Sequence, residues 1–292
     1  MKELVVISGK GGTGKTSVLA SFASLAGNAV TADCDVDAAD LHLVLKPQKI
    51  RSEDFINGRK ATIDGEKCTA CGECYRLCRF DAVKEKRDGR GYLIDALSCE
   101  GCGLCRLACP ADAIILEEAG CGQWFVSETK YGPMVHARLY PGAGNSGRLV
   151  TLVKNEAKKI GEEKGLDLML VDGPPGTGCP VIASISCASL VLAVTEPTFS
   201  GLQDLRRVLE LTAHFKIPAA FCINKWDINS RNTDMMIDTF KDSDVRFIGN
   251  IPYDMDVTRA QLKAMPVVQF SDGYASQQIR RIWEEVCRMM GL

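Results

Sequence analysis

The sequence lacks both an excess of one charge sign and a long apolar run. Its 35 lysines and arginines are balanced by 37 aspartates and glutamates, which gives a net charge of −2 over 292 residues. A near-neutral chain offers neither a basic face for nucleic acid nor a polybasic patch for lipid, so we expect no nucleic-acid and no membrane partner. No apolar run approaches the roughly 18 residues that cross a bilayer.

The N-terminal region also lacks the pattern of a secretory signal. Its apolar stretch, Leu4–Ile7, is short and leads directly into a polar, glycine-rich loop. A signal peptide needs a longer apolar segment, so we expect the protein to be cytoplasmic. Disulfides are rare in that reducing compartment, and the 14 cysteines of the chain therefore need another explanation.

Outside the middle of the chain, short apolar runs alternate with helical patterns. Such runs are typical of strands buried on both faces of a parallel sheet. They cover residues 4–7, 29–32, 168–171, 190–194, 219–223 and 246–248. The alternation predicts an α/β fold, with a mostly parallel sheet flanked by helices.

The last helix is expected over 274–290. One face of it is apolar, and the opposite face carries charges of both signs. Mixed charge favours packing of this helix on the sheet rather than contact with a membrane.

A phosphate-binding loop follows the first predicted strand. Residues 9–16, Gly-Lys-Gly-Gly-Thr-Gly-Lys-Thr, match G-x-x-x-x-G-K-[ST] at every fixed position. Backbone N–H groups of such a loop point at a polyphosphate, and the next helix adds the positive end of its dipole. We expect Lys15 to reach the β- and γ-phosphates of ATP and the Thr16 hydroxyl to ligate Mg²⁺. The predicted nucleotide-binding residues of the loop are Gly11, Gly12, Thr13, Gly14, Lys15, Thr16 and Ser17.

The middle of the chain contains a cysteine pattern, Cys-x2-Cys-x2-Cys-x3-Cys, that occurs twice at an offset of 31 residues. The two runs are Cys68, Cys71, Cys74, Cys78 and Cys99, Cys102, Cys105, Cys109. Bacterial ferredoxins use this spacing, and the fourth cysteine of each run ligates the other cluster. We therefore expect two 4Fe–4S clusters, one on Cys68, Cys71, Cys74 and Cys109 and the other on Cys99, Cys102, Cys105 and Cys78. Zinc is the competing ligand, but its sites use paired C-x2-C units rather than evenly spaced triplets.

We interpret residues 62–118 as a small α+β ferredoxin-like domain. It would be inserted into a discontinuous nucleotide-binding domain of residues 1–61 and 119–292. Residues 123–130 and 133–140 are predicted to form a β-hairpin around Tyr131-Gly132, after the insertion. One departure from the ferredoxin pattern is Arg79, which follows Cys78 where proline is usual. This difference should affect exposure or potential of a cluster more than its ligation.

The lysine at position 10 makes the loop resemble the deviant Walker A motif of the MinD/ParA/Mrp and nitrogenase iron-protein ATPases. The resemblance implies that two protomers enclose two ATP molecules and that Lys10 reaches the partner's phosphates, as an arginine finger does. The alternative is a lysine that makes only local phosphate contacts.

Two aspartate motifs extend the resemblance. Asp33-Cys34-Asp35 resembles switch I, which implies that Asp35 orients the attacking water near Mg²⁺. Asp172-Gly173-Pro174-Pro175-Gly176 resembles the Walker B and switch II element, which implies that Asp172 holds the Mg²⁺ shell. Capping or turn aspartates are the alternative explanation for both motifs.

The segment Asn224-Lys225-Trp226-Asp227 resembles the base-recognition motif of the same family, and Pro252 falls in a segment that resembles its base cover. An asparagine amide pairs with adenine as donor and acceptor together. The N-K-x-D pattern also reads guanine in G-proteins, so GTP stays open on this motif alone, whereas the lysine-bearing loop favours ATP.

Six cysteines fall outside the repeat. Cys179 follows Asp172 by seven residues, the spacing at which the nitrogenase iron protein binds a cluster shared between subunits. That enzyme needs a second cysteine upstream, and the corresponding segment near 142–147 has none, so a buried structural role is favoured over a third cluster. No role is assigned to Cys34, Cys121, Cys187, Cys222 and Cys287, or to His42, His136 and His214.

Taken together, the sequence resembles a MinD/Mrp-type ATPase interrupted by a two-cluster ferredoxin domain. The leading hypothesis is an ATP-hydrolysing iron–sulfur protein that couples nucleotide-driven dimer closure to electron transfer. It would act as a homodimer, or as a heterodimer with a related ATPase, on a redox or metal-cofactor protein partner. The alternatives are an ATPase for assembly or delivery of an iron–sulfur or metal cofactor and, less favoured, a ParA/MinD-like positioning protein.

Overall fold

The structure, a computed structural model, describes residues 1–144 and 146–292. The described chain divides into two compact units. Unit 1 comprises residues 1–53, 124–138 and 146–292, and unit 2 comprises residues 54–123 with 139–144. Unit 2 extends beyond the insertion predicted at 62–118, and the bounds of that insertion stay a prediction.

The sheet of unit 1 is mostly parallel. Its strands are β1 (Lys2–Ser8), β2 (Ala29–Asp33), β3 (Gln48–Ile63), β6 (Ile114–Thr129), β7 (Gly132–Leu139), β8 (Leu168–Pro175), β9 (Leu190–Thr195), β10 (Ala219–Asn224) and β11 (Arg246–Ile251). Within the described residues their order is β11-β10-β9-β1-β8-β2-β7-β6-β3, and neighbours from β11 to β7 pair in parallel. The predicted α/β class is confirmed. The predicted hairpin is also present, since β6 and β7 are neighbours joined by two residues.

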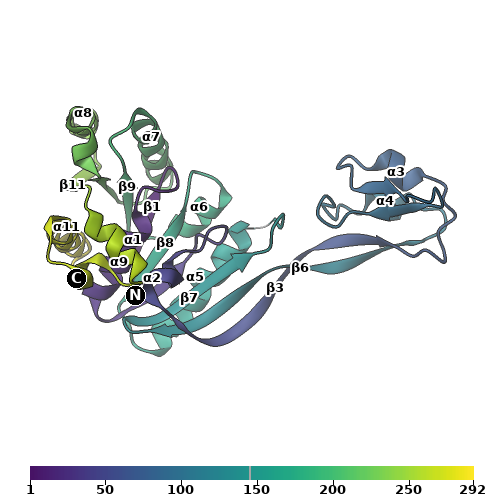
Figure 1. The fold of residues 1–292 in the computed structure, drawn as a ribbon, viewed down its shortest axis with the longest axis horizontal. Helices are drawn as coiled ribbons and strands as arrows, with labels where there is room; N and C mark the ends of the chain where they lie inside the picture. The colour runs from purple at the N-terminus through teal and green to yellow at the C-terminus, as the bar shows by residue number, and fades with distance from the viewer. Residues whose placement is uncertain (145) are drawn as a thin grey trace. The chain divides into compact units, whose positions relative to one another are not determined.

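Helices cover both faces of this sheet (Figure 1). They are α1 (Lys15–Ala26), α2 (Leu41–Leu45), α5 (Ser146–Glu163), α6 (Cys179–Ile185), α7 (Phe199–His214), α8 (Ser230–Phe240), α9 (Met255–Leu262), α10 (Val267–Phe270) and α11 (Tyr274–Met290), with a 3₁₀ turn at Trp226–Ile228. Alternate strand residues such as Leu4 and Val6 share one core cluster with α1 and α11. Residues of opposite parity face the other helices: Phe221 of β10, for example, lies 5.5 Å from Phe240 of α8 between ring centroids.

The C-terminal helix α11 packs on the sheet, as its sequence predicts. Ile279, Ile282 and Val286 are fully buried in the core cluster that α11 shares with α1. The fit against β11 is close, because a Cβ added to Gly249 would lie 2.9 Å from Ile282. Among the described helices, none is both long and apolar enough to cross a membrane.

Parallel strands bring several polar residues to one edge of the sheet. The phosphate loop follows β1, and Asp33 at the end of β2 lies in register with Asp172 of β8. Glu196 comes directly after β9, and Asn224 is the last residue of β10. In open α/β sheets, ligands bind at this carboxyl edge.

Unit 2 contains little regular structure of its own. Its elements are α3 (Glu73–Leu77), β4 (Val83–Glu85), β5 (Tyr92–Ile94) and α4 (Leu104–Leu107), together with parts of β3 and β6. Strands β4 and β5 pair antiparallel. A small core holds the unit together and includes Cys74 and Cys99 beside Val83 and Ile114.

Candidate functional site

A cleft of about 530 Å³ opens at the phosphate loop of unit 1, within the usual size range of small-molecule sites. It is lined by Ser8, Gly11, Gly12, Thr13, Gly14, Lys15, Thr16, Ser17, Asp35, Ala38, Asp40, Leu43, Val44, Pro175 and Gln261. The loop needs glycine at position 14, where φ is +90° and an added Cβ would lie 2.3 Å from the Asn224 amide nitrogen. The structure thus brings the predicted loop residues, from Gly11 to Ser17, to one cleft.

Lys15 lies between the two predicted catalytic aspartates. Its Nζ is 3.0 Å from Asp35 Oδ2 and 3.2 Å from Asp172 Oδ1, and its side chain is nearly buried. Thr16 Oγ1 donates to the other oxygen of Asp172 at 2.8 Å. Burial opposes the charged form of Lys15, but the carboxylates of Asp172 and Asp35 outweigh it, so its pKa is raised. Residues predicted separately from three motifs are therefore in direct contact.

The carboxylates at this point outnumber the cations. Asp33 is fully buried, and its side chain accepts hydrogen bonds from the backbone N–H groups of Asp35 and Leu41. Burial, together with repulsion from Asp172, raises the pKa of Asp33 well above its usual range. Burial also raises the pKa of Asp172. Both oxygens of Asp33 are engaged by backbone N–H groups, so the oxygens that fit Mg²⁺ are those of Asp172, Asp35 and the Thr16 hydroxyl. Mg²⁺ sites in proteins commonly use one or two carboxylates, with water and phosphate completing the shell.

Of the two predicted base-recognition residues, Asn224 lies against the phosphate loop. Asn224 Nδ2 donates to the carbonyl of Thr13 at 2.7 Å, and its Oδ1 accepts from the backbone N–H of Lys225 at 3.0 Å. Both ends of the amide are thus engaged within the chain. Pro252 is buried beyond the end of β11. Neither Asn224 nor Pro252 is among the residues that line the cleft, so their roles stay predictions.

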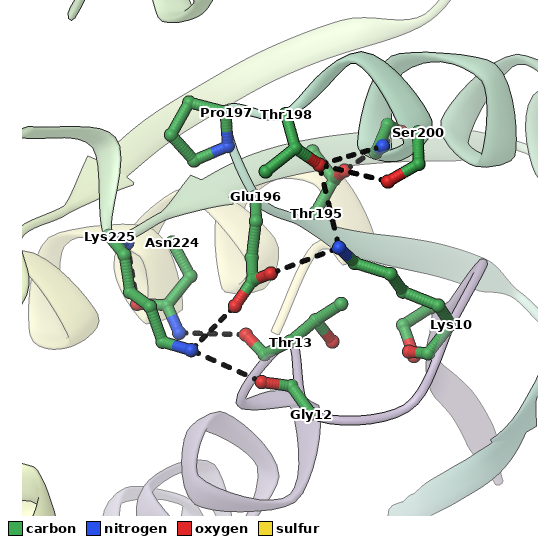
Figure 2. Close-up of polar contacts among 12 residues, drawn as sticks. Lys10, Gly12, Thr13, Thr195, Glu196, Pro197, Thr198, Ser200, Asn224 and Lys225 are labelled. Carbon is green, nitrogen blue, oxygen red and sulfur yellow. Dashed lines mark hydrogen bonds and ion pairs between the residues drawn. The ribbon is translucent and has the colours of Figure 1, made fainter. Parts of the chain in front are cut away.

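Lys10 is not among the residues that line the cleft, and its side chain points toward Glu196 and Thr198, a polar group that the sequence did not indicate (Figure 2). Its Nζ lies 3.3 Å from Glu196 Oε2 and 3.4 Å from Thr198 Oγ1. Lys225 Nζ is 2.5 Å from the other oxygen of Glu196 and donates to the carbonyl of Gly12 at 3.2 Å. Glu196 and Thr198 have no motif around them, and only their place after β9 could have suggested them.

In unit 2, the eight repeated cysteines line two separate hollows. One is lined by Cys78, Cys99, Cys102 and Cys105, and the other by Cys68, Cys71, Cys74 and Cys109. In both hollows, the fourth cysteine of one run joins the first three of the other. This grouping is the crossed arrangement that two-cluster ferredoxins use, so the donor sets fit two 4Fe–4S clusters.

The backbone of unit 2 repeats with the cysteines. Left-handed φ angles occur at Ala70 (57°) and Gly101 (64°), and again at Gly72 (79°) and Gly103 (78°). The short helices α3 and α4 start directly after these two glycines. The two cysteine runs therefore have equivalent loop conformations, which is the condition for two similar ligand sets.

Backbone amides point at several of the sulfurs. Cys99 Sγ accepts from Gly101 N at 3.4 Å, and Cys109 Sγ accepts from Ala113 N at 3.3 Å. Burial opposes ionisation of Cys78, but N–H donors of neighbouring residues outweigh it and lower its pKa. Such N–H···S bonds stabilise thiolates and tune the potentials of clusters.

The repeated cysteines of unit 2 line two hollows, and their side chains do not converge on one point. In the part of the chain that the structure describes, no group of three or more His, Cys, Asp or Glu side chains is placed to hold a single metal ion. The four thiolates of a cubane cluster each bind a different iron, so such a site also requires separated sulfurs.

The cysteines outside the repeat differ in their surroundings. Cys34 and Cys222 are fully buried, and burial raises the pKa of Cys222 to about 12. Cys121 is buried in unit 2 and donates to the Asn57 carbonyl at 2.6 Å. Cys179, for which a buried structural role was expected, is exposed at the start of α6, so that expectation is wrong.

Comparison with known proteins agrees with the geometry of unit 1. The family described as CobQ/CobB/MinD/ParA nucleotide binding domain matches residues 4–267. An uncharacterized protein of Methanocaldococcus jannaschii is 33% identical over 288 residues, which cover 97% of this chain and 96% of that protein.

Two further similarities are more limited. An iron–sulfur cluster carrier protein of Pyrococcus abyssi is 26% identical over 156 residues, which cover 48% of this chain and 52% of that protein. The septum site-determining protein MinD of Pyrococcus horikoshii, complexed with Mg-ADP, superposes with a TM-score of 0.60 at 19% identity, over 99% of this chain and 97% of that one. At this identity the structural match shows the fold alone.

Proposed function

The chain belongs to the CobQ/CobB/MinD/ParA nucleotide-binding family, and on that premise we propose that it is an ATP-hydrolysing switch protein that carries two 4Fe–4S clusters. The observation that carries the proposal is the grouping of cysteines in unit 2, where each hollow is lined by three residues of one run and one of the other. A family ATPase with this addition has the parts for nucleotide-dependent electron transfer.

The nucleotide half of the proposal rests on the charges at the cleft. Lys15 is the phosphate-binding lysine and is held at present by Asp35 and Asp172. Bound Mg²⁺ would supply positive charge beside these carboxylates, and Lys15 would then bind the phosphates of ATP. Thr16 and Asp172, already hydrogen-bonded to each other, are the residues that would hold the Mg²⁺ shell. Asp35 would orient the attacking water.

The cluster half of the proposal rests on the donor set. Cys99, Cys102, Cys105 and Cys78 would hold one cluster, and Cys68, Cys71, Cys74 and Cys109 the other. Clusters of this type accept and donate single electrons. The chain's own contribution is to supply thiolates, to aim backbone N–H groups at them, and to surround them with apolar residues such as Ile94 and Ile114.

A second copy of the chain, or a related ATPase, is the expected partner. Lys10 is not among the residues that line the cleft, and its ammonium group is paired with Glu196. A lysine in that position supports a role across an interface, where it would reach the partner's phosphates.

Delivery of clusters to another protein is the second candidate. It is favoured by the relatives that are named iron–sulfur cluster carrier proteins, although these match only about half of the chain. The two candidates differ in the fate of the iron, because a carrier loses its clusters to an acceptor whereas an electron-transfer protein keeps them.

Anaerobic purification followed by iron and sulfide analysis tests the proposal. We expect about eight iron and eight sulfide per chain, a 4Fe–4S spectrum, and magnesium-dependent ATP hydrolysis. Incubation with an apo-ferredoxin should leave the iron on this protein, and loss of iron to the acceptor would favour delivery instead. Stoichiometric zinc in place of iron, or no ATP hydrolysis, would contradict the proposal.

A further inference from the structure

Glu196 forms ion pairs with two lysines, Lys10 and Lys225, beside the phosphate loop (Figure 2). One carboxylate oxygen lies 3.3 Å from Lys10 Nζ, and the other lies 2.5 Å from Lys225 Nζ. The Glu196 side chain is only 15% exposed, whereas those of Lys10 and Lys225 are 34% and 30% exposed. The carboxylate is therefore the least exposed of the three groups.

The Lys225 side of this arrangement is fixed to the phosphate loop. Lys225 Nζ donates to the Gly12 carbonyl, and the neighbouring Asn224 donates to the Thr13 carbonyl. Glu196 is thereby tied to the loop through a partner that does not need to move. The Lys10 side is different, since its other contact is a 3.4 Å hydrogen bond to Thr198 Oγ1, which also caps the start of α7.

We propose that Glu196 is a positioning residue that holds Lys10 against its own chain in the nucleotide-free protein and releases it to the polyphosphate of a bound nucleotide. The inference rests on the proposed function, because it gives Lys10 a phosphate to reach. To the proposed function it adds a role for Glu196 and a defined position of the Lys10 side chain in the nucleotide-free protein.

The charges allow this exchange without leaving an unpaired group. Two ammonium groups share a single carboxylate, so Lys10 can leave while Lys225 still neutralises Glu196. Burial opposes the charged form of Glu196, but Lys225 and Lys10 outweigh it and lower its pKa, which keeps the carboxylate charged at neutral pH. A polyphosphate carries several negative charges and competes for Lys10 against one.

The test is the reactivity of the Lys10 amine toward an acylating ester, measured by mass spectrometry on the nucleotide-free protein. In Glu196→Gln the ion pair is lost, and we expect Lys10 to react about two- to fivefold faster, as suits a partly exposed ion pair. The matched control is Glu210→Gln, which changes an exposed glutamate on α7 and should leave the rate unchanged. Glu196→Asp keeps the charge and should restore part of the protection.

Lys225→Met tests whether Glu196 restrains Lys10 directly or through the phosphate loop. If Glu196 acts on Lys10 directly, this variant should protect Lys10 at least as well as the wild type does. A Lys10 rate raised as much as in Glu196→Gln would show that the effect passes through the loop and would overturn the proposal. So would an unchanged Lys10 rate in Glu196→Gln, with a thermal melt confirming that the variant is folded.

A final arm adds magnesium and a non-hydrolysable ATP analogue. Lys10 should then bind phosphate in both proteins, so the rates of the wild type and Glu196→Gln should converge. If the analogue leaves both rates unchanged and no binding is seen by calorimetry, the proposed nucleotide function fails. The difference between the two nucleotide-free proteins still decides the role of Glu196.

Discussion

The nucleotide cleft of unit 1 and the cysteine hollows of unit 2 are assembled in opposite ways. The cleft joins residues from distant parts of the chain: Gln261 donates to Ser17 across 244 positions, and Lys15 contacts Asp172 across 157. The hollows use cysteines from a single stretch, Cys68 to Cys109. The first site depends on the sheet that brings strand ends together, whereas the second depends on loop conformations that recur within a short segment.

The two sites also differ in charge. Ion pairs hold the cleft, where Lys15 lies between buried carboxylates. The hollows are lined mainly by apolar residues and thiols, with backbone N–H groups aimed at sulfur. A substitution can therefore damage one site and spare the other, which makes the comparison testable.

Removal of the central cation should have the largest effect. In Lys15→Ala, ATP loses a phosphate contact and the carboxylates of Asp35 and Asp172 lose their counter-ion. We expect kcat/KM for ATP to fall by at least about 10³-fold. Steady-state hydrolysis measures the loss, with Lys159→Ala as an exposed lysine control. Iron content should be unchanged, and a parallel loss of iron would contradict the separate assembly of the two sites.

Lys10→Ala should have the next largest effect, on hydrolysis alone. The Lys10 ammonium group is bound to Glu196 and Thr198 and is not part of the cleft lining, so nucleotide affinity should stay within about threefold of the wild type while kcat falls by about 10²-fold. Calorimetry and steady-state kinetics separate the two quantities. Wild-type kcat in this variant would remove the proposed role of Lys10.

Acid should destabilise unit 1 through His136 of β7. Burial, with repulsion from His42 and Lys49, lowers the pKa of this imidazole from 6.5 to about 4. Between pH 6.5 and 4, His136 is protonated in the unfolded chain but neutral in the folded protein. Above pH 6.5 it is neutral in both states and contributes no pH dependence to stability. As the pH falls from 6.5 toward 4, the free energy of unfolding should drop by roughly 3 kcal/mol from this residue.

Chemical denaturation at several pH values measures that slope. His136→Asn should flatten it between pH 6.5 and 4, whatever its effect on stability at neutral pH. His214→Gln, an exposed histidine on α7, is the control and should keep the wild-type slope. An equal slope in His136→Asn would show that other groups cause the acid sensitivity.

The smallest expected effect is a halving of the iron content. Cys99→Ser removes a thiolate from one hollow, so iron should fall from about eight to about four per chain while ATP hydrolysis is kept. Cys187→Ser, an exposed cysteine outside the repeat, should retain all the iron. Cys78→Ser offers a sharper test, because the crossed arrangement predicts loss of the cluster held by Cys99 and not of the one held by Cys68.

Much of the fold could be predicted because its strands are short, apolar and buried. The fully buried residues of β1 and β9 form continuous runs that need no knowledge of their neighbours. Strand β3 gave no such signal, since most of its 16 residues are exposed and alternation is absent. Residues 48–63 form a strand because they pair with β6, which is distant in the sequence.

The same distinction applies to the sites. The loop around Lys15 follows a fixed local pattern. The cysteine repeat predicted that Cys78 joins the first three cysteines of the second run and that Cys109 joins those of the first run. Glu196 could not be found in this way, because its role comes from contacts with Lys10 and Lys225 that the fold creates. Nor did the sequence show that Asn224 is hydrogen-bonded to the phosphate loop.

The central claim is that nucleotide in unit 1 controls redox chemistry in unit 2. It is tested most directly by the rate of cluster oxidation under anaerobic stopped-flow conditions, with reduced protein and a mild oxidant. The rate is compared without nucleotide, with magnesium and ADP, and with magnesium and a non-hydrolysable ATP analogue. We expect the ATP analogue to change the rate in the wild type and to leave it unchanged in Lys15→Ala. Identical rates of the wild type in all three states would contradict the account.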